Sequence, residues 1–148
     1  MKVRIELDPQ MDEPEMIIRA PRLTEEVARL QQLILEQKMT PLTFYKDRSE
    51  YFVDVSKILF FETDGEKIYG HTREEAYEVR KKLYELEEIL PIAFCRISKS
   101  TIVNTKQIYS IEKSFSGTST VNFYQTHKQV HVSRHYYQLL KERLKEMR

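Results

Sequence analysis

The chain has 148 residues, 41% of them hydrophobic and 32% charged, which is enough to bury the core of one domain and keep its surface hydrated. Its only cysteine, Cys95, excludes a disulfide framework and a thiolate zinc cluster, and no apolar run reaches the roughly 18–20 residues that cross a membrane. The charged alternation of residues 1–8 lacks the apolar stretch of a signal peptide, so we expect a soluble protein of the cytoplasm.

The net charge of +1 is unevenly distributed along the chain. Residues 1–41 carry a net charge of −2, residues 42–90 a net charge of −4, and residues 91–148 a net charge of +7. Such an asymmetry favours an anionic partner for the last third of the chain, with nucleic acid and a membrane surface as the usual candidates. A solvated basic helix is the alternative, because five of the ten cations in the last third lie within residues 134–148.

The first part of the chain is predicted to form a strand-and-helix arm. Apolar and charged residues alternate over residues 3–7, which predicts a half-buried strand, and residues 16–19 predict a second one. Apolar residues then recur at spacings of four, three and four from Leu23, which predicts a helix that begins near Thr24. We interpret residues 1–41 as this arm.

From Leu42 onward the sequence predicts mainly short strands connected by polar turns. A helix is expected over residues 76–89, although its first residues also fit a strand, and another after Ser133, whose hydroxyl group is expected to cap it. The predicted class is α+β, mainly β with three helices attached. Strands are expected at residues 42–46, 50–55, 58–61, 67–72, 94–97, 101–103, 108–113, 118–124 and 129–132.

Three of the connections carry residues that suit nucleic acid. Ser98-Lys99-Ser100 joins two short strands and offers a cation, two hydroxyl groups and backbone N–H groups for phosphate oxygens or a guanine edge. Arg134 lies in the first turn of the final helix, where free N–H groups favour an anion and the arginine fork fits guanine or phosphate. The turn at residues 63–67 has mixed charges. Each motif taken alone fits an ordinary polar surface at least as well.

Three sequence features, taken in order, resemble the LytTR-type DNA-binding domain. They are Ile58-Leu59-Phe60-Phe61-Glu62, Phe94-x-Arg96-Ile97-Ser98-Lys99-Ser100-x-x-Val103-Asn104 and Val132-Ser133-Arg134-x-Tyr136. The resemblance covers residues 42–144, and the middle feature is its most specific part. It implies small stacked β-sheets that insert loops, rather than a helix, into successive major grooves. We therefore expect a sequence-specific, double-stranded DNA-binding transcription regulator of bacterial type, with residues 42–148 as its DNA-binding domain.

The resemblance also implies which residues contact DNA. Lys99 and Arg134 match base-contacting positions, and the turn with Glu66 and Lys67 matches a third contacting loop, in which Lys67 is the better cation. Ser98 stands where a histidine is frequent in the family. Ser100 and His135 are expected near the DNA backbone. We further expect phosphate contacts, which make affinity fall with salt, from Lys106, Lys113, Lys128 and Ser100.

Assembly and control can also be anticipated. We expect a homodimer on two repeated half-sites about one helical turn apart. The helix after Thr24 either docks on its own domain or pairs with a second copy, and we favour pairing because its apolar positions need cover. The first 41 residues are too few for the receiver domain often found before this type of domain, so we expect no control by aspartyl phosphorylation. Stand-alone relatives often work beside a membrane protein that restrains them, and such an inhibitor is an expected partner.

Other functions have less support in the sequence. The main alternative is a protein-interaction or sensory module without a nucleic-acid ligand, in which the N-terminal arm would be the working part. RNA binding ranks third, because we find no aromatic pair with ribonucleoprotein spacing. No catalytic motif occurs, and His127, His131 and His135 would not share one face, so we expect no enzyme, metal, cofactor or small-molecule substrate.

Overall fold

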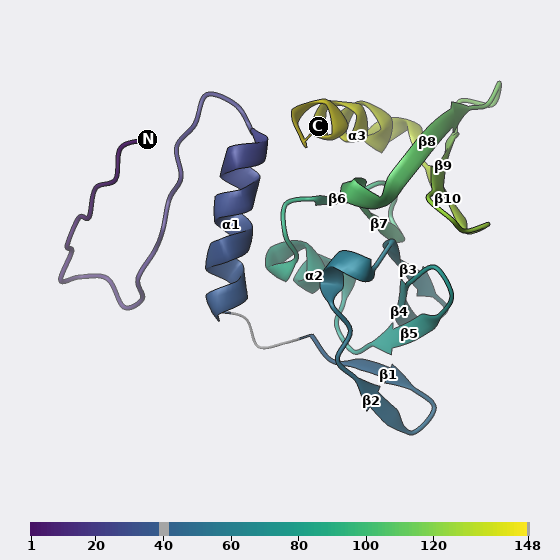
Figure 1. Cartoon of the computed structure of the whole chain (residues 1–148), viewed down its shortest axis with the longest axis horizontal. Helices are drawn as coiled ribbons and strands as arrows, with labels where there is room; N and C mark the ends of the chain where they lie inside the picture. The colour runs from purple at the N-terminus through teal and green to yellow at the C-terminus, as the bar shows by residue number, and fades with distance from the viewer. Residues whose placement is uncertain (39–41, 148) are drawn as a thin grey trace.

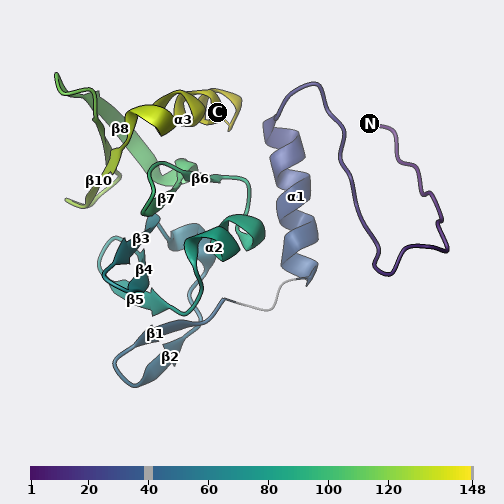
Figure 2. The same cartoon turned by 180° about the vertical axis from the view of Figure 1, so that it is seen from behind.

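The computed structural model describes residues 1–38 and 42–147 of the chain. Residues 1–24 contain no helix or strand, and helix α1 (Glu25–Lys38) follows them. Figures 1 and 2 both show α1 between this N-terminal segment and the rest of the protein. In the part of the chain that the structure describes, no helix is long and apolar enough to cross a membrane.

Seven strands form the larger sheet, which is antiparallel throughout and has the order β2-β1-β5-β4-β3-β7-β6. A short helix, α2 (Leu83–Ile89), connects β5 to β6, and single 3₁₀ turns at Val55–Lys57 (η1) and Thr105–Gln107 (η2) precede β3 and follow β7. The strands are β1 (Phe44–Lys46), β2 (Ser49–Tyr51), β3 (Phe60–Asp64), β4 (Lys67–His71), β5 (Ala76–Val79), β6 (Phe94–Arg96) and β7 (Thr101–Asn104).

Three further strands form a smaller antiparallel sheet with the order β10-β9-β8. They are β8 (Ile108–Lys113), β9 (Ser119–Phe123) and β10 (Gln129–Val132), and α3 (Arg134–Met147) follows them. Both views of the protein show this sheet and α3 on the same side of β6 and β7, with β3, β4 and β5 on the other side (Figures 1 and 2). The predicted α+β class, mainly β with three helices, is confirmed.

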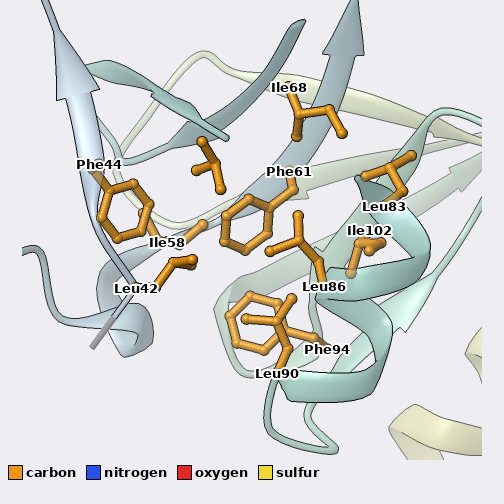
Figure 3. Close-up of a cluster of buried hydrophobic side chains, with 11 residues drawn as sticks. Leu42, Phe44, Ile58, Phe61, Ile68, Leu83, Leu86, Leu90, Phe94 and Ile102 are labelled. Carbon is orange, nitrogen blue, oxygen red and sulfur yellow. The ribbon is translucent and has the colours of Figure 1, made fainter. Parts of the chain in front are cut away.

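Strand β3 explains why the sequence around it is continuously apolar. Phe61 packs in a first cluster of buried side chains that includes Phe44 of β1 and Leu86 of α2 (Figure 3). Its neighbour Phe60 faces a second cluster and stacks on Phe123 of β9, with ring centroids 5.5 Å apart. A strand that is buried on both faces has apolar residues at successive positions instead of an alternation. The larger sheet is therefore covered on both faces at β3.

Glycine is required where aromatic rings approach β4 closely. A Cβ atom on Gly70 would lie 3.0 Å from ring carbons of both Phe44 and Phe61. That separation is tighter than ordinary van der Waals contact, so any larger residue would push the rings of the first cluster apart.

The strands predicted at residues 3–7 and 16–19 are wrong. Val3, Ile5 and Leu7 are 87%, 83% and 91% exposed, and neither segment is paired with a strand of the described chain. A strand needs a neighbour for its backbone N–H and C=O groups, and an isolated segment has none, whatever its pattern of side chains.

The predicted helix over residues 76–89 is two elements. Residues Ala76–Val79 form β5, which pairs with β4 and β1, and α2 begins only at Leu83. Val79, Leu83, Leu86 and Leu90 all contribute to the first cluster. The buried residues of a strand and of the helix after it therefore happen to be spaced like the apolar residues of one continuous helix.

The predicted hydroxyl cap at Ser133 is also wrong. Its Oγ atom is buried and has no hydrogen-bond partner among the described residues. The backbone of Ser133 is engaged instead, because its N–H donates to Ile97 O at 3.0 Å and its carbonyl accepts from Tyr136 N at 3.1 Å. The tether to the connection before β7 fixes the start of α3.

Helix α1 docks on its own domain. Ala28 is 7% exposed, Gln31 Oε1 accepts a hydrogen bond from Ile92 N at 2.9 Å, and Glu25 lies 3.8 Å from Lys106 Nζ. Of the two roles expected for this helix, the structure has the docked one. Self-association of the chain stays a prediction.

Candidate nucleic-acid interface

Four connections gather at one end of the two sheets, and we call this region the loop end. Backbone hydrogen bonds join three of them: Thr63 N donates to Ser100 O at 2.9 Å, and Ser133 N donates to Ile97 O at 3.0 Å. The fourth is joined through the side chain of Arg134, described below. The connections are residues 63–67 (β3 to β4), 97–101 (β6 to β7), 113–119 (β8 to β9) and 132–134 (β10 to α3).

Lys99 lies at the exposed tip of the connection between β6 and β7. The connection is shaped by Arg96, whose Nε donates to Ser98 O at 2.7 Å and whose Nη2 donates to Lys99 O. Glu87 of α2 pairs with the Nη1 atom of the same guanidinium. The ammonium group of Lys99 itself has no hydrogen bond or ion pair with any described residue, so it is available to an external anion.

Arg134 lies over the turn between β8 and β9. Its Nη2 donates to Ser116 O at 2.7 Å, and its guanidinium occupies the space beside Gly117. The side chain is exposed and has no acidic partner within residues 1–38 and 42–147. A cavity of about 180 Å³ beside Arg134 is also lined by Lys113, whose Nζ atom lies over the ring of Tyr137 at 4.7 Å from its centroid.

The turn between β3 and β4 is electrostatically mixed. Lys67 and Glu66 are both exposed, and Lys67 Nζ lies 3.7 Å from a carboxylate oxygen of Glu78 on β5. Burial raises the pKa of Glu62 on β3, and the neighbouring Asp64 carboxylate raises that pKa further. Because Asp64 and Glu66 add negative charge and Glu78 pairs with Lys67, this turn offers less net positive charge than the connections with Lys99 and Arg134.

The small polar residues of the motifs lie on or next to the same connections. Ser98 Oγ accepts a hydrogen bond from Ser100 N at 3.2 Å, and the two hydroxyl oxygens are 3.4 Å apart. These contacts hold the connection in a tight turn. His135 is exposed on the first turn of α3, where its ring meets Tyr136 edge-on with centroids 5.0 Å apart.

Two predicted phosphate contacts lie away from the loop end. Lys99 and Ser100 come directly before β7, whereas Lys106 comes after it and so lies at the opposite end of the strand. Lys128 Nζ donates to the carbonyl oxygens of Thr72 and Glu75 at 2.8 Å, next to the end of β4 that lies opposite Lys67. The structure therefore groups Lys99, Lys113 and Arg134 and separates Lys106 and Lys128 from them.

Lys128 also has an altered electrostatic environment. Burial lowers its pKa, and the nearby Glu75 only partly opposes this. Burial, together with the charge of Lys128, lowers the pKa of His71 to about 4, so His71 is neutral at physiological pH. The hydrogen bonds from Lys128 Nζ to Thr72 O and Glu75 O hold the connection between β4 and β5.

Sequence reasoning missed two residues that shape the loop end. Arg96 is part of the middle feature but was assigned no role, and Gly117 lies in none of the three sequence features. The signal for Arg96 was its place directly before the Lys99 connection. No sequence signal tied Gly117 to Arg134, because the two are brought together only by the fold.

Both the sequence and the fold of the chain resemble those of known proteins. Residues 48–145 match the model of the LytTr DNA-binding domain. The chain belongs to this family. A LytTr DNA-binding domain from Bacillus cereus has the same fold, with a TM-score of 0.65 and 25% identity, and the match covers 72% of this chain and 98% of that one. The LytTr assignment therefore rests on both sequence and fold.

Relatives are similar to this LytTr chain over nearly their whole length. An uncharacterized HTH-type transcriptional regulator of Staphylococcus aureus (strain bovine RF122 / ET3-1) is 30% identical over 148 residues, covering 97% of this chain and 98% of the relative. One from strain MSSA476 is 28% identical over 145 residues, with the same coverage. Despite those names, no two helices follow one another through a short turn in the described part of this chain.

We predict that Gly117→Ala weakens DNA binding of this LytTr domain. An added Cβ atom would lie 2.0 Å from Arg134 Nε, so the guanidinium must leave its place over the turn. Gly117 has φ +89°, so alanine there also costs stability, about 1–2 kcal/mol. Affinity for duplex DNA, measured by fluorescence anisotropy, is expected to fall toward that of Arg134→Ala.

Gly65→Ala is the matched control for backbone strain. Gly65 also has a positive φ, +65°, but a Cβ atom there would meet nothing within 4 Å. We expect this variant to lose stability in thermal unfolding while Arg134 stays in place. Wild-type affinity in the Gly117→Ala variant would show that the position of Arg134 over the turn is irrelevant to binding.

Proposed function

We propose that this chain is a transcription regulator that binds a specific duplex sequence through its loop end. The observation that carries the proposal is the backbone tethering of the Lys99 connection to the start of α3, next to Arg134. Two flexible cations on rigidly joined connections can contact the same stretch of a groove. The relatives named as transcriptional regulators support the regulatory part of the proposal.

Loops suit the groove better than either helix that flanks the sheets. The exposed side of α2 carries Glu87 and Glu88, which phosphate groups would repel. The apolar side of α3 is used for packing, because Leu140 is fully buried in the second cluster. We therefore propose that the connections themselves enter the major groove, with Lys99 and Arg134 at base edges.

The two base contacts would use different chemistry. Arg134 donates one hydrogen bond to Ser116 O, and its remaining N–H groups can form a bidentate pair with O6 and N7 of guanine. Lys99 has a single ammonium group, which fits one acceptor edge. Each good base contact supplies about 1–3 kcal/mol of discrimination.

Phosphate contacts would come from the rim of the loop end. Lys113 lies beside Arg134, Ser98 and Ser100 lie on the connection that carries Lys99, and His135 follows Arg134 on α3. Lys67 is a weaker candidate because Glu78 partly neutralises it, and Glu66 adds negative charge to its turn. Lys106 and Lys128 are poor candidates because they lie away from this end and Lys128 is held by carbonyl groups.

We further propose that two copies occupy two half-sites about one helical turn apart. One loop end covers only a short stretch of duplex, and a single short site is a weak source of specificity among many competing sequences. Two linked copies gain affinity because the second binds at a high effective concentration.

Selection of bound duplexes from a random pool tests the proposed function. We expect enrichment of one sequence motif, repeated at a spacing of about 10 base pairs, and an affinity that falls as salt rises. Retention of all duplexes to the same extent would contradict sequence-specific readout. No retention even at low salt would contradict DNA binding as the function of this chain and favour the protein-interaction alternative.

A further inference from the structure

The N-terminal residues 2–8 form an uncovered apolar stripe with an ordered charge pattern. Val3, Ile5 and Leu7 are all more than four-fifths exposed. The charged residues alternate with them: Lys2 and Arg4 come before Ile5, and Glu6 and Asp8 come after it. In extended backbone, alternate residues lie on one face, so the three apolar side chains share one face and the four charges share the other.

This segment is complementary to itself. When two copies are paired antiparallel with Ile5 opposite Ile5, Lys2 lies opposite Asp8 and Arg4 lies opposite Glu6, while Val3 lies opposite Leu7. Opposite charges on facing residues stabilise a strand pair, and like charges destabilise it. All four charged residues are satisfied at once, and the six apolar side chains of the two copies come together on one face.

Other pairings of the same residues are less favourable. A parallel pair in register would place every charge opposite its own sign. An antiparallel shift of two residues in either direction would put Arg4 opposite Arg4 or Glu6 opposite Glu6. A shift of one residue would turn apolar side chains toward charged ones. The register centred on Ile5 is therefore the one that the charges select.

The structure leaves this segment accessible for such pairing. It lies on the far side of α1 from the two sheets in both views of the protein (Figures 1 and 2). Its backbone N–H and C=O groups are not paired with a strand of the described chain. Within the segment, Arg4 Nη2 and Glu6 Oε1 lie 2.7 Å apart, which agrees with both side chains being on one face.

A turn ends the segment at Asp8. Asp8 O accepts from Met11 N at 3.2 Å, and Asp8 Oδ1 accepts from Gln10 N at 2.9 Å, so the chain bends directly after the segment. Met16 and Ile18 follow this bend and are 63% and 39% exposed. Together with Val27 and Ile34 of α1, Met16 and Ile18 line a cavity beside that helix, so the apolar face of residues 2–8 stays uncovered.

We propose that residues 2–8 pair antiparallel with residues 2–8 of a second copy of this chain, about a two-fold axis at Ile5, and so form a homodimer. This names the contact for the two copies in the proposed function, but it does not depend on DNA. The docked α1 would then connect the dimer contact to the DNA-binding domain.

Charge reversal in matched halves tests the pairing by sedimentation without DNA. The full chain is expected to be a dimer. The Lys2→Glu/Arg4→Glu variant and the Glu6→Lys/Asp8→Lys variant should each be monomeric. All four charges of the segment are acidic in the first variant and basic in the second, so two copies of either variant repel each other. An equimolar mixture should form a heterodimer, and the variant with all four changes should again be a homodimer. A monomeric wild type, or half-reversed variants that stay dimeric, would overturn the proposal.

Cysteine cross-linking tests the register in the full chain. Directly opposite residues have Cα atoms about 4.5–5.5 Å apart, which is within reach of a disulfide. Ile5→Cys should cross-link to itself under mild oxidation. Val3→Cys should not do so alone but should cross-link to a Leu7→Cys chain, while the natural Cys95 is buried. Equal self-cross-linking of Val3→Cys and Ile5→Cys would overturn the register. Because the arm lies outside both buried clusters, these variants should melt like the wild type, and their DNA binding can be scored separately.

Discussion

Replacement of Arg134 by alanine is expected to raise the Kd for the cognate duplex about five- to 150-fold, which corresponds to about 1–3 kcal/mol. The side chain is exposed and has no acidic partner in the described chain, so its removal should leave the fold intact. Non-specific duplex should lose much less affinity, because it forms no base contact with the arginine. Titrations of both duplexes at one salt concentration measure the two effects.

Two further variants sharpen this test. Arg134→Lys keeps the charge but loses the planar fork, so it should behave like alanine on the cognate duplex and like the wild type on non-specific duplex. Arg48→Ala removes an exposed cation from the turn between β1 and β2, outside the loop end, and should change neither affinity. If Arg134→Ala weakens both duplexes equally, Arg134 is a phosphate contact and its proposed readout role is wrong.

Replacement of Phe61 by alanine is expected to lower the free energy of unfolding by about 3–5 kcal/mol. Phe61 is fully buried at the centre of the first cluster, with ring centroids 6.4 Å from Phe44 and 5.8 Å from Phe94. The loss combines the transfer of the ring out of the core with the cavity left among rigid neighbours. Since domains of this size are stable by only about 5–15 kcal/mol, much of the population would unfold on warming.

Phe52→Ala is the matched control for this substitution. Phe52 is 75% exposed, so the same chemical change should cost less than about 0.5 kcal/mol. Urea denaturation followed by circular dichroism gives both free energies. A loss at Phe61 no larger than that at Phe52 would mean that the first cluster does not hold the larger sheet together.

Several parts of the fold followed directly from local pattern. The apolar run at residues 58–61 predicted a buried strand, and β3 begins within it at Phe60, although it continues to Asp64. The polar turns predicted the hairpins between β3 and β4 and between β8 and β9. These elements are decided by which side chains are apolar and where glycine or small polar residues permit a turn. Residues close together in sequence are therefore enough to predict these elements.

Other elements depended on partners that lie far away in sequence. Residues 76–79 became a strand because β4 and β1 were available on either side, although their spacing continued that of α2. Residues 3–7 remained unpaired in the single chain despite a strand-like pattern, because no edge reaches them. Ser133 does not cap α3 through its hydroxyl group, because Tyr136 N in the first turn donates to the carbonyl oxygen of Ser133 instead.

For the candidate site, the sequence by itself determined the chemical types: Lys99 and Arg134 on short connections, with hydroxyl groups beside them, in the order typical of the LytTr family. Only the tertiary structure decided which cations lie together. In an antiparallel sheet, the direction of each strand decides at which end of the sheet the residues before and after that strand lie. Lys113 therefore lies at the same end as Arg134, while Lys106 and Lys128 lie away from it. The carbonyl groups around Lys128 and the glycine beneath Arg134 come from segments distant in sequence, and their effects are physical contacts that no local pattern encodes.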